Sequence, residues 1–256
     1  CKPDAKLCNG DILTIYIKDE FLGQKSSDEY NFLKAPTNID IIYEDENILL
    51  VNKRPGLIVH PDETYHFDSL IARIQHYLYK KGEYNPQKEN SFIPALANRI
   101  DRNTGGIVIA AKNAETLRIL NQKIKNRELK KFYLCIAYSK FKKKDDTLTA
   151  YLEKNEKQNR VYIHNSQMEN TKIIKTQYHV IAEKGNFSLL EVELLTGRTH
   201  QIRAHLAFLG HPLLGDSKYG KNSINKEKSY KWQALYSYKL KFEFSSPAGI
   251  LSYLNR

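Results

Sequence analysis

Two patterns of apolar positions alternate along the chain and predict its secondary structure. Short unbroken apolar runs that end at turn-forming residues are typical of buried strands, whereas apolar residues three or four positions apart are typical of helices. Strands are predicted at residues 12–17, 48–51, 56–59, 107–111, 132–138, 178–182 and 187–195. Helices are predicted after the N-cap residues Asp68 and Asn113 and around residues 200–209, and Gly82 and Gly210 are stop signals.

The last predicted strand has a different pattern. Apolar residues occupy every second position from Ala234 to Phe244, and Lys239, Lys241 and Glu243 lie between them. This alternation predicts a strand with one face in the core and the other in water.

Strands outnumber helices in this pattern, and turn signals such as Gly185-Asn186 join neighbouring strands as hairpins. The sequence therefore predicts an α+β fold with a mostly antiparallel, mixed central sheet flanked by helices and loops. With 256 residues, 41% of them hydrophobic, the chain suits one substantial domain plus an extra piece. We expect the end of a small domain at residues 1–18, a polar linker at 19–38 and the main domain at 39–256.

The chain is strongly basic, with 40 Lys and Arg residues against 29 Asp and Glu and a net charge of +11. Such a surface attracts polyanions through counterion release, although a merely soluble basic protein explains the charge equally well. Basic residues gather at residues 123–131, 140–144 and 218–231. Each of these stretches suits contacts with RNA phosphates, or is only a solvated face.

The cysteines Cys1, Cys8 and Cys135 form neither a paired framework nor a metal-ligand spacing, which favours a reducing, cytoplasmic setting. No apolar run approaches the roughly 20 residues of a membrane span. Because the chain begins at Cys1 and its only methionine is Met168, part of the natural N-terminus is expected to precede it.

Candidate chemistry begins with the segment NRIDRNTGG at residues 98–106, just ahead of a predicted strand. Asp101 lies between Arg99 and Arg102, and positive neighbours keep a carboxylate ionised, as a nucleophile requires. The glycines allow tight backbone and the close approach of a ligand. From the residues alone, a surface charge cluster at a turn explains the segment better than a catalytic site does.

A second candidate segment runs from Leu195 to Gly220, where a strand ends and a helix begins. His200 and Arg203 lie three positions apart and so share a helix face near the helix start, which is a natural phosphate site. A zinc site of His200, His205 and His211 is the weaker alternative, since His200 and His205 lie on different faces and no fourth ligand is evident. Ordinary surface histidines explain the pattern better than zinc does.

Four segments of the chain, in their order and spacing, resemble the RluA family of pseudouridine synthases. The family motif HRLDxxTSG reads NRIDRNTGG here, and LxTGRTHQIRxHLxxLGHPxLGDxxYG is matched almost throughout between Leu195 and Gly220. The earlier segment NKPxGLxVHP corresponds to residues 52–61, with its proline shifted to Pro55, and the KxY element to residues 131–133. Asn98 and Gly105 stand where the family has His and Ser.

The resemblance implies the pseudouridine synthase catalytic fold over residues 39–256, no cofactor and no metal. It implies Asp101 as the catalytic aspartate, Arg203 as its salt-bridge partner and Tyr133 as a ring that stacks on uracil and whose hydroxyl could take the proton from carbon 5. Without the resemblance, Tyr133 would be taken as a core aromatic residue and Arg203 as a solvated helix residue. Four further residues are expected to contact RNA or substrate: Arg99, which would enter the RNA stack, Arg198, His200 and Lys53.

The resemblance further implies isomerisation of uridines in structured RNA after base flipping. It leaves open whether Asp101 attacks the sugar, attacks the base or acts as a general base. Residues 1–18 resemble the tail of a small RNA-binding domain shared with a small-subunit ribosomal protein, which favours ribosomal RNA over transfer RNA as the substrate. A nucleoside or glycoside hydrolase with Asp216 as its second carboxylate and a catalytically silent RNA-binding protein are the competing functions. A monomer is expected, because no interface stripe is evident.

Overall fold

The computed structural model describes residues 27–62, 67–88, 92–220 and 230–255, together with positions 6, 8, 10, 12 and 225. The predicted end of an RNA-binding domain at residues 1–18 therefore lies outside the described residues, apart from isolated positions. In the described stretches no helix has both the length and the apolar character needed to cross a membrane.

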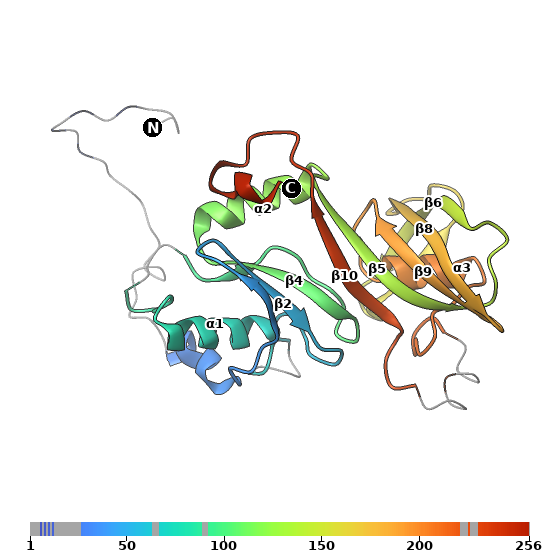
Figure 1. Ribbon diagram of the computed structural model, residues 1–256, viewed down its shortest axis with the longest axis horizontal. Coiled ribbons are helices and arrows are strands. Elements are labelled where there is room, and N and C mark those ends of the chain that lie inside the picture. The colour runs from blue at the N-terminus through green and yellow to red at the C-terminus, as the bar shows by residue number, and fades with distance from the viewer. Residues whose placement is uncertain are drawn as a thin grey trace.

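One large sheet organises the described part of the molecule (Figure 1). Its strand order is β1-β2-β4-β10-β5-β9-β8-β6-β7, with β3 beside β4. The strands are β1 (Ile41–Glu44), β2 (Ile48–Lys53), β3 (Ala95–Leu96), β4 (Gly105–Ala111), β5 (Leu129–Tyr138), β6 (Asp145–Asn155), β7 (Arg160–His164), β8 (Lys172–Lys184), β9 (Phe187–Leu194) and β10 (Leu235–Phe242). All described pairs are antiparallel except β4 with β10. The predicted α+β class with a mostly antiparallel mixed sheet is confirmed.

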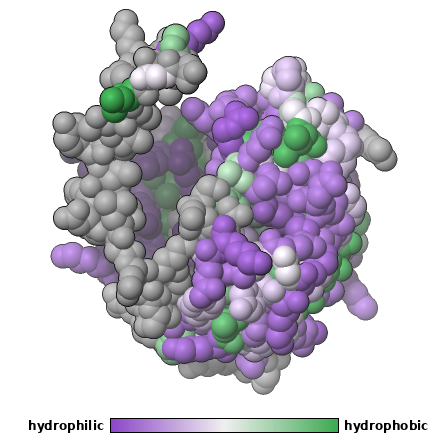
Figure 2. All heavy atoms as spheres, turned by 90° about the vertical axis from the view of Figure 1, so that its left-hand side faces the viewer, coloured by the Kyte–Doolittle hydropathy of each residue, from purple (hydrophilic) through white to green (hydrophobic). Residues whose placement is uncertain are grey.

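Helices cover both faces of the β1-β2-β4 half of the sheet. The helical segments are η2 (Ser27–Lys34), α1 (Leu70–Lys81), α2 (Ala114–Lys125), α3 (Gln201–Phe208) and η3 (Gly249–Leu254). Alternate residues of β4 serve the two faces: Val108 and Ala110 pack in the core beneath α1, and Ile109 and Ala111 in the core beneath α2 and η3. In the other half, α3 packs on β7 and β8. Seen from the end that carries α1 and α2, the described surface is mainly hydrophilic, as solvent-facing surface should be (Figure 2).

Most of the predicted helix boundaries are confirmed. Asn113 caps α2 through its side chain, and Gly82 ends α1 in the left-handed conformation at φ 79°. The N-cap of α1 is Ser69 and not the predicted Asp68, because the Ser69 hydroxyl accepts a hydrogen bond from the Ala72 N–H while Asp68 is bound to Arg73.

The apolar run at residues 56–59 does not form the predicted strand. Gly56 adopts φ 92°, and the Ile58 and Val59 carbonyls accept hydrogen bonds from the Leu70 and Ile71 N–H groups. These are N–H groups that the first turn of α1 cannot satisfy itself. The run is therefore an irregular segment that caps α1. Its apolar residues reflect burial and not strand pairing, which is why the sequence pattern resembled a strand.

The predicted linker at residues 19–38 is partly packed. Phe32 in η2 and Ala35 directly after it are buried in the core with α1. The His76 ring is hydrogen-bonded to the Ala35 carbonyl. Residues 30–35 therefore belong to the folded body rather than to a linker.

Strand β10 joins the two halves of the sheet and departs from its predicted alternation. Leu235 and Ser237 are buried and Tyr236 is 38% exposed, the reverse of the predicted faces, because the register against β5 shifts between Ser237 and Lys239. Gly105 and Gly106 of β4 pair with this part of β10, and a Cβ on Gly106 would lie 2.1 Å from the Ser237 carbonyl oxygen. The paired glycines thus admit a neighbouring strand, and not a ligand.

Candidate active site

A pocket of about 280 Å³ opens where the β3–β4 loop, the middle of β5 and the β9–α3 connection meet. Its lining includes Asp101, Tyr133, Arg203, His200 and Arg198, which come from distant parts of the sequence. The pocket therefore brings together both segments that the sequence singled out.

Asp101 presents its carboxylate to this pocket. The Arg203 Nη1 donates to Asp101 Oδ2 at 2.8 Å, and the Asp101 side chain is 24% exposed. The following loop is tied down because the Thr104 N–H donates to the Asp101 carbonyl and the Gly56 N–H to the Arg102 carbonyl. A fixed loop with an accessible, ion-paired carboxylate suits nucleophilic or general-base chemistry.

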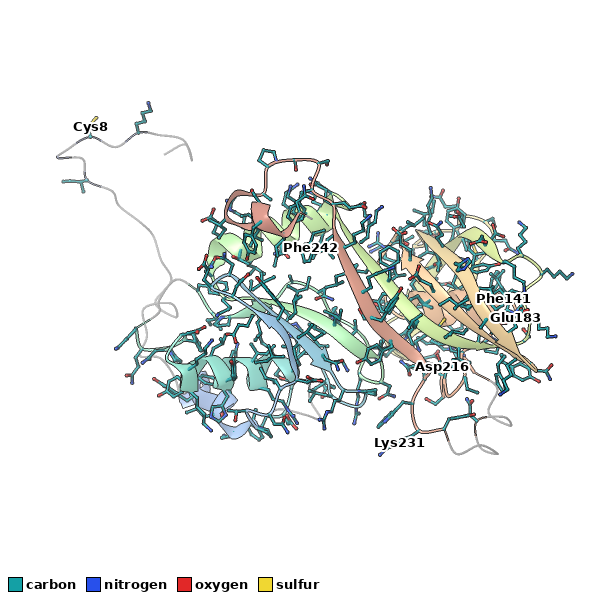
Figure 3. All side chains as sticks on the ribbon, in the orientation of Figure 1. Cys8, Phe141, Glu183, Asp216, Lys231 and Phe242 are labelled. Carbon is teal, nitrogen blue, oxygen red and sulfur yellow. The ribbon has the colours of Figure 1, made fainter. Side chains whose placement is uncertain are left out.

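Arg203 itself is held from behind by Asp216, in the connection from α3 to β10 (Figure 3). Arg203 Nε and Nη2 donate to the two Asp216 carboxylate oxygens at 2.7 and 3.0 Å, and one of these oxygens also accepts the Lys218 and Tyr219 N–H groups. Burial works against both charges, but the hydrogen bonds between them outweigh it, raising the pKa of Arg203 and lowering that of Asp216. Arg203 therefore stays charged and points one N–H at Asp101.

Tyr133 forms a wall of the pocket and is 6% exposed. Burial raises the pKa of its phenol, and the Asp101 carboxylate acts in the same direction, while a hydrogen bond with Ser237 opposes them. The phenol therefore keeps its proton in the unliganded pocket, and the ring offers an apolar face for a base.

His200 begins α3 in a left-handed conformation at φ 52°. Its Nδ1 lies 2.9 Å from the Tyr219 hydroxyl, and its Nε2 lies 4.0 Å from Asp101 Oδ2. Burial lowers the pKa of His200 to about 4, so the ring is neutral at neutral pH.

Of the residues predicted to contact RNA or substrate, Arg99 and Arg198 line the pocket, but Lys53 does not. The Lys53 side chain is 1% exposed, and its ammonium donates to the carbonyls of Arg54, Leu57 and Arg102. Burial lowers the pKa of Lys53 to about 7, against the effect of nearby Asp101. Lys53 therefore fixes the backbone next to Asp101, because its three donors are already used by the protein.

Sequence reasoning assigned no role to Gln201 and Tyr219 of this site, and it placed Lys131 only in a basic stretch suited to RNA phosphates. Lys131 lines the pocket, Gln201 fixes the Arg198 backbone through its side-chain oxygen, and Tyr219 bonds to His200. The place of Lys131 in the pocket could have been predicted, because it lies two positions from Tyr133 on one strand and therefore shares its face. Burial, followed by the proximity of Arg127, lowers the pKa of Lys131.

The three histidines considered for zinc have separate partners. His205 is bonded to Thr176, and His211 to Ser139, while His200 faces Tyr219. Within the described ranges no three His, Cys, Asp or Glu side chains gather in a group that could hold a metal ion.

Comparisons with known proteins agree with this picture. The human protein RNA pseudouridylate synthase domain containing 1 has the same fold, with a TM-score of 0.65 at 23% identity over 91% of this chain and 89% of that one. The chain is 34% identical over 210 residues to ribosomal large subunit pseudouridine synthase D of Borreliella burgdorferi. It is 36% identical over 225 residues to an uncharacterised RNA pseudouridine synthase of Mycoplasma genitalium.

A model of the RNA pseudouridylate synthase family matches residues 47–208. The chain therefore belongs to this family, and its motifs are those of the RluA type. The matches cover 81% and 86% of this chain but 63% and 68% of the Borreliella and Mycoplasma relatives, so the chain spans about two thirds of their length.

Proposed function

We propose that this protein converts specific uridines of structured RNA to pseudouridine, with Asp101 as the reacting carboxylate. The observation that carries the proposal is the partly exposed Asp101 carboxylate, ion-paired to Arg203 at 2.8 Å beside the buried ring of Tyr133. Membership of the pseudouridylate synthase family supports the same reaction.

The reaction breaks the bond from the ribose carbon 1′ to uracil N1 and makes a bond from that carbon to uracil C5. The proton at C5 leaves and N1 gains one, so substrate and product are isomers. Cationic character at the ribose carbon during the exchange is stabilised by a neighbouring carboxylate, which either pairs with it or attacks it. Arg203 supports this role because it keeps Asp101 oriented while leaving it accessible.

The target uridine has to leave its stack to enter the pocket, which costs a few kcal/mol. Arg99, Arg198 and Lys131 line the pocket, and their cationic groups suit phosphates on either side of the flipped nucleotide. We assign Tyr133 to packing against the uracil ring. Its raised pKa disfavours removal of the C5 proton by this phenol unless another group takes the phenol proton.

Ribosomal RNA is our proposed substrate. The name of the Borreliella relative refers to the large ribosomal subunit, and the net charge of +11 suits a large structured RNA. Transfer RNA is the alternative.

The hydrolase alternative requires a second carboxylate for acid–base work. Asp216, the candidate for this role, has no exposed surface and accepts hydrogen bonds on both oxygens. It therefore has no free oxygen to protonate a leaving group, which favours the isomerase.

In the test, the purified protein is incubated with unmodified transcripts of ribosomal and transfer RNA, which contain uridine but no pseudouridine. Asp101→Asn is treated in parallel, and pseudouridine is mapped chemically. We expect pseudouridine at a discrete site of ribosomal RNA and none with the variant. RNA from a strain that lacks this protein is a second substrate, in case modification needs a partly assembled particle.

Each of the other outcomes supports a different substrate or function for this protein. Pseudouridine only in transfer RNA would replace the proposed substrate and keep the reaction. Free uracil would support the hydrolase, and RNA binding without any product from either source of RNA would support a silent RNA-binding module.

A further inference from the structure

The His200 ring lies between two groups that differ in what they can donate. On one side, Nδ1 is 2.9 Å from the Tyr219 hydroxyl, and on the other, Nε2 is 4.0 Å from Asp101 Oδ2. A neutral imidazole carries its proton on only one nitrogen, so these neighbours decide which one.

The hydrogen bonds around Tyr219 indicate that Nδ1 of His200 carries no proton. The Val161 N–H donates to the Tyr219 hydroxyl oxygen at 2.9 Å. Since that oxygen already accepts this bond, its own proton is best used toward His200 Nδ1, which must then be an acceptor. Nε2 consequently carries the proton.

The other side of the ring gives the same assignment. A carboxylate oxygen only accepts hydrogen bonds, so a bare Nε2 facing Asp101 would place two lone pairs against each other. An Nε2–H instead points a donor at Oδ2. A separation of 4.0 Å is too long for a formed hydrogen bond, but such contacts often tighten when substrate enters.

Burial keeps the His200 ring neutral, and the charges that face it act in both directions. Burial is the main effect and lowers its pKa to about 4; Arg203 and Lys218 lower it further, while Asp101 and Asp216 oppose them. At neutral pH, therefore, the tautomer and not the charge is the property that the surroundings control.

The backbone at His200 indicates that this placement is enforced. A φ of 52° is costly for a residue other than glycine, and such strain persists only where the surroundings hold it. Although His200 occupies the N-cap position of α3, its side chain makes no capping bond. The side chain instead bonds to the Tyr219 hydroxyl. The guanidinium carbons of Arg203 and Arg160 lie 5.3 and 5.1 Å from the centre of the Tyr219 ring.

We propose that Tyr219 fixes His200 as the Nε2–H tautomer, and that this N–H, together with Arg203, holds Oδ2 of Asp101 so that Oδ1 faces the substrate. His200 and Tyr219 are thus positioning residues, which act on the reaction only through Asp101. Among the described residues, Arg203 is the hydrogen-bond donor to this carboxylate, and it too uses Oδ2. The consequence for catalysis rests on the proposed function, whereas the tautomer does not.

The tautomer can be read directly by long-range ¹H–¹⁵N correlation NMR on the full chain labelled at its eight histidines. The His200 signals are assigned by their absence in His200→Gln. We expect the Nε2–H pattern in the wild type and a smaller excess of this form over Nδ1–H in Tyr219→Phe, where only Asp101 still favours it. The matched control is Tyr162→Phe. The Tyr162 hydroxyl that it removes donates to Gln158 within the β6–β7 hairpin, away from His200. An Nδ1–H ring in the wild type, or no change in Tyr219→Phe, would overturn the proposal.

Single-turnover kinetics test the consequence for Asp101. Tyr219→Phe should lower the rate constant roughly tenfold, the size expected for one lost orienting hydrogen bond, with RNA affinity unchanged. Glutamine places an amide N–H near the position of Nε2 and has no tautomer, so His200→Gln should retain more activity than His200→Asn.

The double variant gives the sharpest result. In the His200→Gln background, Tyr219→Phe should have little further effect, because no tautomer remains to be fixed. Full additivity of the two substitutions would contradict the proposal. If the wild type makes no pseudouridine, the proposed function fails while the NMR result still decides the tautomer; if Tyr219→Phe does not fold, the wild-type spectrum decides it alone.

Discussion

Two carboxylates share the guanidinium of Arg203, and their surroundings differ sharply. Asp216 has no exposed surface and accepts two bonds from Arg203 and two from backbone N–H groups. Asp101 accepts one bond from Arg203 and keeps 24% of its side-chain exposure. Arg203 thus pairs with a buried supporting carboxylate on one side and with an accessible carboxylate, our proposed reacting group, on the other.

The comparison shows that an ion pair alone does not identify a reactive carboxylate. What separates the two residues is how many acceptor positions remain free and whether the group reaches a pocket. Asp216 is saturated, so its contribution is to hold Arg203, whereas Asp101 can still accept a proton or form a bond.

The largest expected effect on stability comes from Asp216→Asn. This substitution removes the charge that compensates the buried Arg203, and breaking such a pair should cost roughly 3–5 kcal/mol. Asp101→Asn should cost less than about 1 kcal/mol, because Arg203 keeps Asp216 and the site is partly solvated. Urea unfolding of both variants measures the difference. Equal losses would mean that the two carboxylates support the fold alike.

A second prediction concerns His205, which holds the Arg203 helix from the opposite side through Thr176. Burial lowers the pKa of His205 from 6.5 to about 4, so between these pH values the unfolded chain takes up a proton that the native state does not. Stability from this residue is therefore complete above pH 6.5 and lost as the pH falls, by about 2 kcal/mol at pH 5.

The variant His205→Asn keeps a polar partner for Thr176 but does not titrate. Urea unfolding at pH 7 and pH 5 should show a smaller loss in this variant than in the wild type, whatever its stability at pH 7. The same loss in both proteins would rule out His205 as the source of the pH dependence.

The smallest expected effect lies next to the Asp101 loop, at Gly105, where the family has Ser. A Cβ at Gly105 would lie 2.7 and 2.8 Å from two ring carbons of Tyr236 and 3.2 Å from Pro55. Gly105→Ser should therefore destabilise the protein by about 1–2 kcal/mol, limited because the Tyr236 ring is partly exposed and can move.

The double variant Gly105→Ser with Tyr236→Ala tests the cause. If the ring is what excludes the Cβ, thermal unfolding should show a loss clearly smaller than the sum of the two single losses. Additive losses would place the strain in the backbone instead.

Local signals in the sequence predicted much of this structure. The strands at 48–51 and 107–111 and the Asn113 and Gly82 caps follow from short-range patterns, and the structure contains all of them. The motif segments also indicated Asp101 and Arg203, because their residue types are specific and their order along the chain is fixed.

Features that depend on tertiary contacts could not be predicted in this way. The run at 56–59 caps a helix, Lys53 turns inward to three carbonyls, and β10 changes faces at a register shift. The deciding partners of the run and of β10 are distant in sequence, and so is the Arg102 carbonyl among the three that Lys53 binds. Tyr219 was overlooked for the same reason, since its role depends on His200 and on the Val161 N–H of β7.

The most direct test of the central claim measures pseudouridine formation, RNA affinity and melting temperature on the same preparation of Asp101→Asn. Our account predicts wild-type affinity and melting temperature together with a rate of product formation lower by roughly 10³-fold or more. Near-normal product formation by a stable, RNA-binding Asp101→Asn protein would contradict the assignment of Asp101 as the reacting carboxylate.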